Sequence, residues 1–169
     1  ASKLGIIEND FVFGCLGRME KFSPEYIDLS IKILEKFKNT KLLIAGPNDK
    51  TMIIEKLKMY IDSKRVIILE PVKSQIVGYL FDICLETFPL ASGSSVLELM
   101  AKGVPCLTIK MDRKEDFSSQ RDEELVLEEE EVIEKIKFLF EENNYKKYSK
   151  RALSLIDNLY NNAEMKHAI

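Results

Sequence analysis

Short apolar runs alternate along the chain with longer stretches in which apolar residues recur every three or four positions. The runs have the length of buried strands, and the longer stretches have the spacing of amphipathic helices. The expected strands cover residues 11–16, 42–45, 66–69, 83–85, 105–109 and 125–127. The expected helices cover residues 23–37, 50–61, 74–80, 93–102, 128–140 and 145–161. Because β and α segments alternate, the pattern predicts an α/β fold with a Rossmann-like, doubly wound parallel sheet.

Turn and cap residues support these boundaries. Ser23-Pro24-Glu25 offers a capping serine, a proline at the first helical position and an acidic first turn. The segment 110–124 is polar and charged, and it predicts no regular element. No repeat or linker divides the 169 residues, so we expect residues 1–169 to form a single domain.

Composition narrows the class of protein. Apolar residues make up 46% of the chain and charged residues 31%, which is typical of soluble globular domains. The net charge of −3 argues against a general nucleic-acid binder, so an anionic ligand would need local cations and backbone groups. No apolar run has the length of a membrane span, and no signal peptide is visible.

The cysteines and the histidine limit the chemistry further. Cys15, Cys84 and Cys106 each lie in an apolar run, which indicates buried, reduced thiols in a cytoplasmic protein. They lack metal-ligand spacing, and the one histidine, His167, is in the tail. The sequence therefore predicts neither a zinc site nor a histidine-based triad.

The strongest candidate for a binding site follows the strand expected at 83–85. Gly93-Ser94-Ser95 opens a helix directly after this buried strand, where free backbone N–H groups favour an anion. Ligands of open α/β sheets bind at this carboxyl edge of the strands. The same serines could act only as a helix cap. Glu98 could bind a ribose diol or only complement the helix dipole.

Two other connections contribute candidate residues. Arg18 and Lys21 lie between the first strand and the first helix, where they could hold phosphate or be ordinary solvated charges. No G-x-G-x-x-G dinucleotide motif is present. Pro71-Val72 follows the third strand and could offer backbone groups to a base. Asp82 and Glu86 flank the fourth strand, where a structural role is favoured over paired acid–base chemistry.

Taken together, residues 4–155 resemble the C-terminal, nucleotide-sugar-binding half of a GT-B fold glycosyltransferase. The segments 42–47 and 132–140 are similar to the second strand and a closing helix of such halves. Within that group the motifs are most similar to O-GlcNAc transferases and bacterial protein N-glucosyltransferases. The motif residues are the segment Glu86–Pro89, the turn Gly93-Ser94-Ser95, Glu98, the Gly103–Pro105 turn and the segment Lys21–Pro24.

The resemblance implies a role for each matched residue. Lys21, Arg18 and the Gly93-Ser94-Ser95 turn would hold the diphosphate, Glu98 the ribose, and Pro71-Val72 the base. Leu90 departs from the pattern, because retaining families usually carry a glutamate eight residues before the position of Glu98. The stereochemical outcome therefore stays open.

The resemblance implies an enzyme that transfers sugar from a nucleoside-diphosphate donor, most closely a UDP-sugar, with no metal required. The N-terminal acceptor half would be a missing part of the same polypeptide, so this domain alone would transfer sugar weakly or not at all. Two alternatives stay open: the half-domain of a UDP-sugar 2-epimerase, and a non-catalytic nucleotide-binding or interaction domain.

Overall fold

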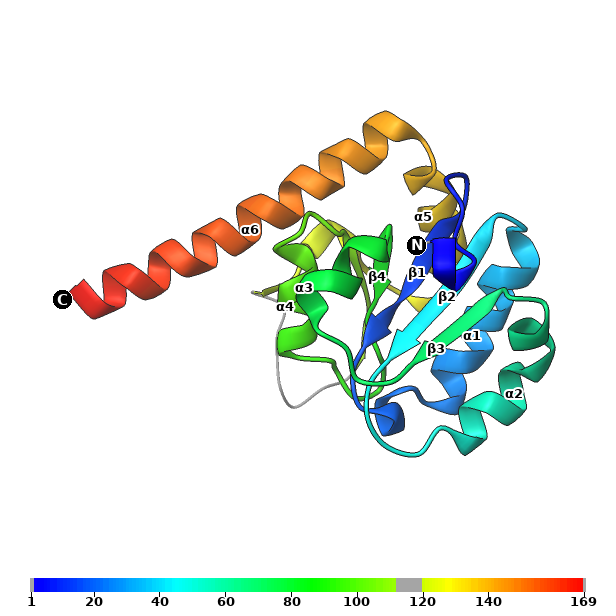
Figure 1. The fold of residues 1–169 in the computed structure, drawn as a ribbon. Helices are drawn as coiled ribbons and strands as arrows, with labels where there is room; N and C mark the ends of the chain where they lie inside the picture. The colour runs from blue at the N-terminus through cyan, green and yellow to red at the C-terminus, as the bar shows by residue number, and fades with distance from the viewer. Residues whose placement is uncertain (1, 112–119, 169) are drawn as a thin grey trace.

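The computed structural model describes residues 2–111 and 120–168, with side chains up to residue 163. Its sheet has six parallel strands in the order β3-β2-β1-β4-β5-β6 (Figure 1). This order is that of a doubly wound Rossmann-like fold, and it confirms the predicted class. The strands are β1 Phe11–Leu16, β2 Thr40–Ala45, β3 Val66–Leu69, β4 Ile83–Leu85, β5 Cys106–Ile109 and β6 Val126–Leu127.

Helices cover both faces of this sheet. The α-helices are α1 Pro24–Lys36, α2 Thr51–Asp62, α3 Ser74–Val77, α4 Ser94–Met100, α5 Val132–Leu139 and α6 Glu142–Ala168. The 3-10 turns are η1 Ser2–Leu4, η2 Met19–Lys21, η3 Gly78–Leu80, η5 Glu123–Leu125 and η6 Glu129–Glu131. Helices α1 and α2 lie on one side of the sheet and α3 and α4 on the other (Figure 1). Right-handed β-α-β crossovers in both directions from β1 produce this arrangement.

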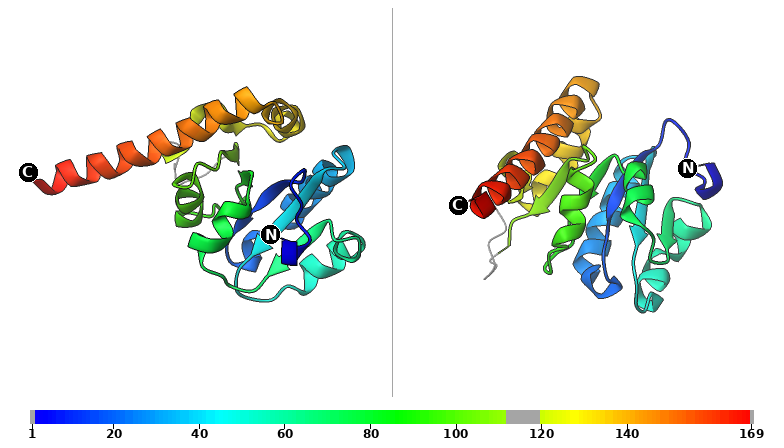
Figure 2. Two further views of the ribbon diagram at one scale, coloured as in Figure 1. Left: turned by 45° about the horizontal axis from the view of Figure 1, so that its top comes forward. Right: turned by 60° about the vertical axis from the view of Figure 1, so that its left-hand side comes forward.

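Four helices differ from the sequence prediction. The helix predicted for 128–140 divides into η6 and α5, because the Glu131 carboxylate accepts the Glu128 N–H at 2.9 Å and closes a tight turn. The one predicted for 74–80 divides into α3 and η3, and α4 ends at Met100 rather than Lys102. Helix α6 is longer than predicted, and its C-terminal part extends away from the sheet (Figure 2).

The central strands are buried on both faces, as their apolar sequences predict. In β1 every residue from Val12 to Leu16 is buried. Cys15, Cys84 and Cys106 are buried free thiols, and the Sγ atoms of Cys15 and Cys84 are 3.7 Å apart. The prediction of buried, reduced thiols is therefore confirmed.

Parts of two sequence predictions fall outside the described residues, namely positions 112–119 of the segment 110–124 and the side chain of His167. Within 2–111 and 120–163 no three His, Cys, Asp or Glu side chains are grouped so that they could hold a metal ion. No helix in the described part of the chain is long and apolar enough to cross a membrane.

Candidate functional site

A cleft of about 340 Å³ opens where β1, β2, β3 and β4 end. Its walls come from the four connections that follow these strands and from the first turns of α3 and α4. The lining residues are Leu16, Gly17, Arg18, Lys21, Ala45, Gly46, Pro47, Pro71, Val72, Ser74, Ser92, Ser94, Ser95 and Glu98. The structure thus brings together every residue assigned to the nucleotide from the sequence except Gly93, which lies at the N-cap of α4.

The first connection presents Lys21 to the cleft. Met19 and Phe22 are buried on either side of it and fix the η2 turn. A Cβ placed on Gly17 would lie 3.8 Å from Lys21 Cδ and 3.9 Å from Ser92 Oγ. The lysine stem therefore crosses Gly17 near the β4–α4 connection, and the side chain is half-buried.

Arg18 is held differently. Its Nε lies 3.5 Å from Glu20 Oε1, and both side chains are exposed. Glu20 also accepts two hydrogen bonds from Asn48, at 2.8 and 3.1 Å, and these bonds chiefly lower the pKa of Glu20. In the described part of the chain Arg18 is thus paired with a carboxylate, whereas Lys21 has no ion-pair partner.

Backbone contacts join the first connection to the second. Gly17 donates to the Ala45 carbonyl and Met19 to the Pro47 carbonyl, each at 3.0 Å. A Cβ on Gly46 would lie only 1.7 Å from the Gly17 carbonyl oxygen. Only glycine at position 46 permits this approach, so the two loops form one rigid wall of the cleft.

The β4–α4 connection is fixed by buried hydroxyl groups. Ser23 caps α1 by accepting the Tyr26 N–H at 3.1 Å, and its hydroxyl donates to the Phe88 carbonyl at 2.6 Å. Ser92 Oγ lies 2.6 Å from Thr87 Oγ1 within the same loop. The predicted Ser23 cap is therefore present, and it also ties the first loop to the fourth.

The turn before α4 supplies hydrogen-bond donors. Gly93 has φ +57° and ψ −122°, a left-handed conformation that favours glycine. No side chain caps the helix, and the Ser95 N–H donates to the Ser92 carbonyl oxygen at a long 3.4 Å. Ser94 is exposed and Ser95 half-exposed at the cleft. Because α4 has only seven residues, local N–H and O–H groups dominate over a long-range helix dipole.

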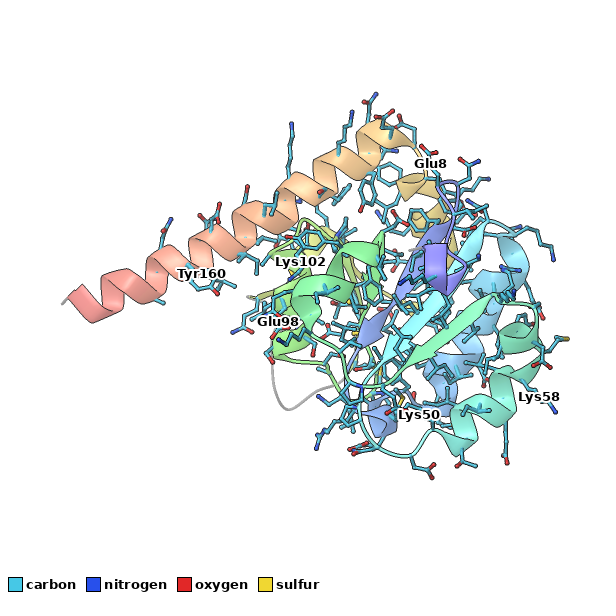
Figure 3. All side chains as sticks on the ribbon, viewed as in Figure 1. Glu8, Lys50, Lys58, Glu98, Lys102 and Tyr160 are labelled. Atoms are coloured by element: carbon cyan, nitrogen blue, oxygen red, sulfur yellow. The ribbon has the colours of Figure 1, made fainter. Side chains whose placement is uncertain are left out.

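Glu98 is the fifth residue of α4 and therefore lies beyond the first turn of the helix. It is exposed at the side of the cleft (Figure 3). Pro71 and Val72 also line the cleft, and Val72 is 42% exposed. An apolar surface beside a carboxylate suits a ligand that carries a flat ring and a diol.

Sequence reasoning did not assign seven of the lining residues to the site: Leu16, Gly17, Ala45, Gly46, Pro47, Ser74 and Ser92. Ser74 is the first residue of α3, at the end of the connection that begins with Pro71-Val72. The rule that connections at the carboxyl edge line the ligand crevice could have identified it.

The two carboxylates that flank β4 have separate structural partners. Asp82 accepts the Val12 N–H at 2.7 Å, and burial raises the pKa of its carboxyl group. Glu86 is buried in an ion pair with Arg121, whose Nη2 lies 2.8 Å from Glu86 Oε2. The preference for a structural role over acid–base pairing is confirmed. Arg121 was missed, because it lies in the segment that predicted no element.

A second cavity of about 500 Å³ adjoins the cleft and shares Ser74, Ser94 and Glu98 with it. Its other walls come from α4 and α6, including Lys102 and Tyr160 (Figure 3). Apolar side chains predominate there, in contrast to the serines and lysine of the first cleft.

Solved structures share this fold. An O-GlcNAc transferase mutant from Thermobaculum terrenum is 22% identical with a TM-score of 0.72, over 88% of this chain and 32% of that one. The pneumococcal O-GlcNAc transferase GtfA, in complex with UDP and GlcNAc, is 12% identical with a TM-score of 0.73, over 89% of this chain and 33% of that one. The chain thus spans about a third of the length of both enzymes.

A third structure is itself a single domain. It is the C-terminal domain of the glycosyl transferase group 1 family protein LpcC from Francisella tularensis. It is 17% identical with a TM-score of 0.65, over 89% of this chain and 86% of that one. At these identities the likeness shows a shared fold, that of the C-terminal half of GT-B glycosyltransferases.

No curated protein matches the sequence. Residues 10–157 match the family described as Glycosyl transferases group 1, and this match covers most of the chain. The chain therefore belongs to the group 1 glycosyl transferases.

Proposed function

We propose that the cleft binds the nucleoside diphosphate of a UDP-sugar, so that the glycosyl group can be transferred to an acceptor. The observation that carries this proposal is the meeting of Lys21 with Ser94 and Ser95 at the carboxyl edge of the sheet. A half-buried cation without an ion-pair partner in the described residues, beside hydroxyl and N–H donors, suits a phosphate group.

The chemistry of the lining residues suggests which part of the nucleotide each of them contacts. We propose that Lys21, Ser94 and Ser95 contact the diphosphate, that Glu98 accepts hydrogen bonds from the ribose diol, and that Val72 packs beside the base. Gly93 adopts the backbone conformation of the turn before α4 and does not contact the ligand. Pro71 forms part of the cleft wall beside the base. Arg18 contributes from the rim, where Glu20 competes for its guanidinium group.

The chemical role of this domain follows from the charges. As the sugar leaves, negative charge grows on the departing diphosphate, and preorganised donors stabilise that charge. We propose that Lys21 and the α4 donors supply this stabilisation without a metal ion. The acceptor site and the catalytic base would come from an N-terminal half, which accords with the chain's 32% coverage of the Thermobaculum enzyme.

The choice of UDP rests on the motif resemblance and on the pneumococcal relative, which is described with UDP and GlcNAc. A cytoplasmic location is proposed from the three buried, unpaired thiols, because oxidising compartments favour disulfides.

A thermal-shift titration with UDP, GDP and uridine tests the binding proposal. A ligand that binds only the folded state stabilises it by about 2.7 kcal/mol at a hundredfold excess over Kd. We expect UDP to raise the Tm more than GDP does, and uridine to have the smallest effect. A UDP shift no larger than that of uridine would contradict a phosphate site. Repeating the titration in the presence of EDTA tests the proposal that UDP binds without a metal ion. If chelation abolishes the rise in Tm caused by UDP, that proposal is wrong.

The two alternatives make different forecasts for a protein that carries both halves. A UDP-sugar 2-epimerase would invert the sugar at C2 without an acceptor, and a non-catalytic domain would bind UDP without changing the sugar. The match to group 1 glycosyl transferases favours transfer.

A further inference from the structure

Arg121 and Glu86 form a buried ion pair directly behind the α4 turn. Arg121 Nε donates to Glu86 Oε1 at 3.0 Å and Nη2 to Oε2 at 2.8 Å, so the pairing is bidentate. Each side chain is only 1% exposed. Thr108 adds a third hydrogen bond by donating to Glu86 Oε1 at 2.9 Å.

A contribution to the stability of the fold does not by itself explain why two charged residues are buried here. Removing two charges from water costs several kcal/mol per ion, and apolar residues of similar volume often serve as well. Burial, the largest single cause, opposes the charge of Arg121, but the hydrogen bonds that Arg121 donates to Glu86 and the attraction of that carboxylate together raise the pKa of the guanidinium group. Arg121 therefore stays charged at neutral pH, and the two hydrogen bonds give the pair a defined orientation.

The orientation matters because of what lies on the other side of Arg121. Its Nη2 also approaches the Gly93 carbonyl oxygen at 3.5 Å, a long hydrogen bond from a charged donor. A trans peptide unit carries its C=O and N–H on opposite sides. With the Gly93 carbonyl held toward Arg121, the Ser94 N–H of the same unit is directed away from Arg121, and Ser94 is one of the residues that line the cleft.

We propose that Arg121, held by Glu86, is a positioning residue that aims the Ser94 N–H at the diphosphate. Neither side chain is among those that line the cleft, so both act through the Gly93 turn and not by contact with the ligand. This inference rests on the proposed function, because it assigns the turn a phosphate to bind.

The neighbouring residue provides a matched control. Asp122 is also buried and also forms a bidentate pair, accepting from Arg151 Nε at 2.8 Å and from Nη2 at 2.7 Å. That pair anchors α6 rather than the α4 turn. Both pairs are bidentate, but Arg151 is 34% exposed and also pairs with Glu124, and the Asp122–Arg151 pair is attached to α6 instead of the α4 turn.

The test replaces both members of the Glu86–Arg121 pair at once, as Glu86→Gln with Arg121→Met. Removing both charges avoids an unpaired buried ion, so the fold should survive. Calorimetry then measures Kd for UDP and for uridine in this variant, the parent chain and the control Asp122→Asn with Arg151→Gln. We expect UDP affinity to fall about tenfold in the first variant, the loss of one charged hydrogen bond of about 1.5 kcal/mol.

Uridine affinity should stay within about twofold in that variant, because uridine has no phosphate to contact the Ser94 N–H. The control should bind both ligands as the parent does, because its substitutions do not touch the Gly93 turn. If the folded first variant keeps parental UDP affinity, or loses UDP and uridine in equal proportion, the inference is overturned. A parent chain that does not prefer UDP to uridine would overturn the proposed function itself.

A second variant keeps the test decisive if the first does not melt cooperatively. Arg121→Lys retains the positive charge beside Glu86. The lysine ammonium lacks the planar set of N–H donors with which arginine contacts both the carboxylate and the Gly93 carbonyl. The same selective loss of UDP affinity is expected. Unchanged UDP affinity in this variant would overturn the inference.

Discussion

Replacing Lys21 with alanine removes the cation on which the phosphate assignment depends most. The side chain lies between two buried anchors, Met19 and Phe22, so the η2 turn should keep its shape in the variant. Lys21 has no ion-pair partner in the described residues, so the substitution leaves no opposite charge unpaired. The effect should therefore fall on binding and spare the stability of the fold.

The magnitude follows from the burial of Lys21. A hydrogen bond to a charged group contributes about 1.5–3 kcal/mol. Because Lys21 is half-buried, solvent screens part of this interaction, and the lower end of the range applies. A loss of about 1.5–2 kcal/mol corresponds to a rise of about 10–30-fold in Kd for UDP. Uridine, which lacks the diphosphate, should bind with unchanged affinity.

Isothermal titration calorimetry on the parent chain and Lys21→Ala measures this difference. Lys56→Ala is the matched control, since it removes the same charge from the surface of α2, where Lys56 pairs with Asp28 at 3.6 Å. Arg18→Ala should have a smaller effect than Lys21→Ala, because Arg18 is exposed and shared with Glu20. Equal UDP affinity in Lys21→Ala and the parent would refute the reasoning, and so would an equal loss in Lys56→Ala.

Three further changes test other parts of the account. Glu98→Gln should weaken UDP and uridine alike and leave pyrophosphate binding unchanged, as measured by calorimetry; loss of pyrophosphate binding would contradict a ribose contact. Gly46→Ala should lower the free energy of unfolding by about 1–3 kcal/mol, because the new Cβ would lie 1.7 Å from the Gly17 carbonyl oxygen; an unchanged urea midpoint would show that the loops can separate freely. Burial raises the pKa of Asp82, so its stabilising contribution is present below its ordinary pKa and is lost as pH rises through the raised pKa. Asp82→Asn keeps an acceptor for the Val12 N–H and should gain stability relative to the parent from acidic to neutral pH, whereas a pH-independent difference in urea midpoint would contradict this.

The sheet and the frame of the cleft could be predicted because their causes are local. A strand buried on both faces must be a short apolar run, and β1 is such a run. Once the strands alternate with helices, topology brings the carboxyl ends together without any side chain specifying it. Lys21, Ser94 and Val72 could thus be placed at one edge from their positions after strands.

The Arg121–Glu86 pair could not be predicted in this way. Arg121 lies in a run of charged residues with no periodicity, and such runs are usually solvated. Its burial depends on a carboxylate 35 positions earlier, a contact that only the folded sheet creates.

The most direct test of the central claim is an amide NMR titration of the chain with UDP. The account predicts saturable shifts at Gly17, Lys21, Ser94 and Ser95, and it predicts that uridine moves only the amides near Val72 and Glu98. Shifts confined to the cavity beside Tyr160, or no saturable shift at the Ser94 and Ser95 amides, would contradict the assignment of this cleft to a nucleoside diphosphate.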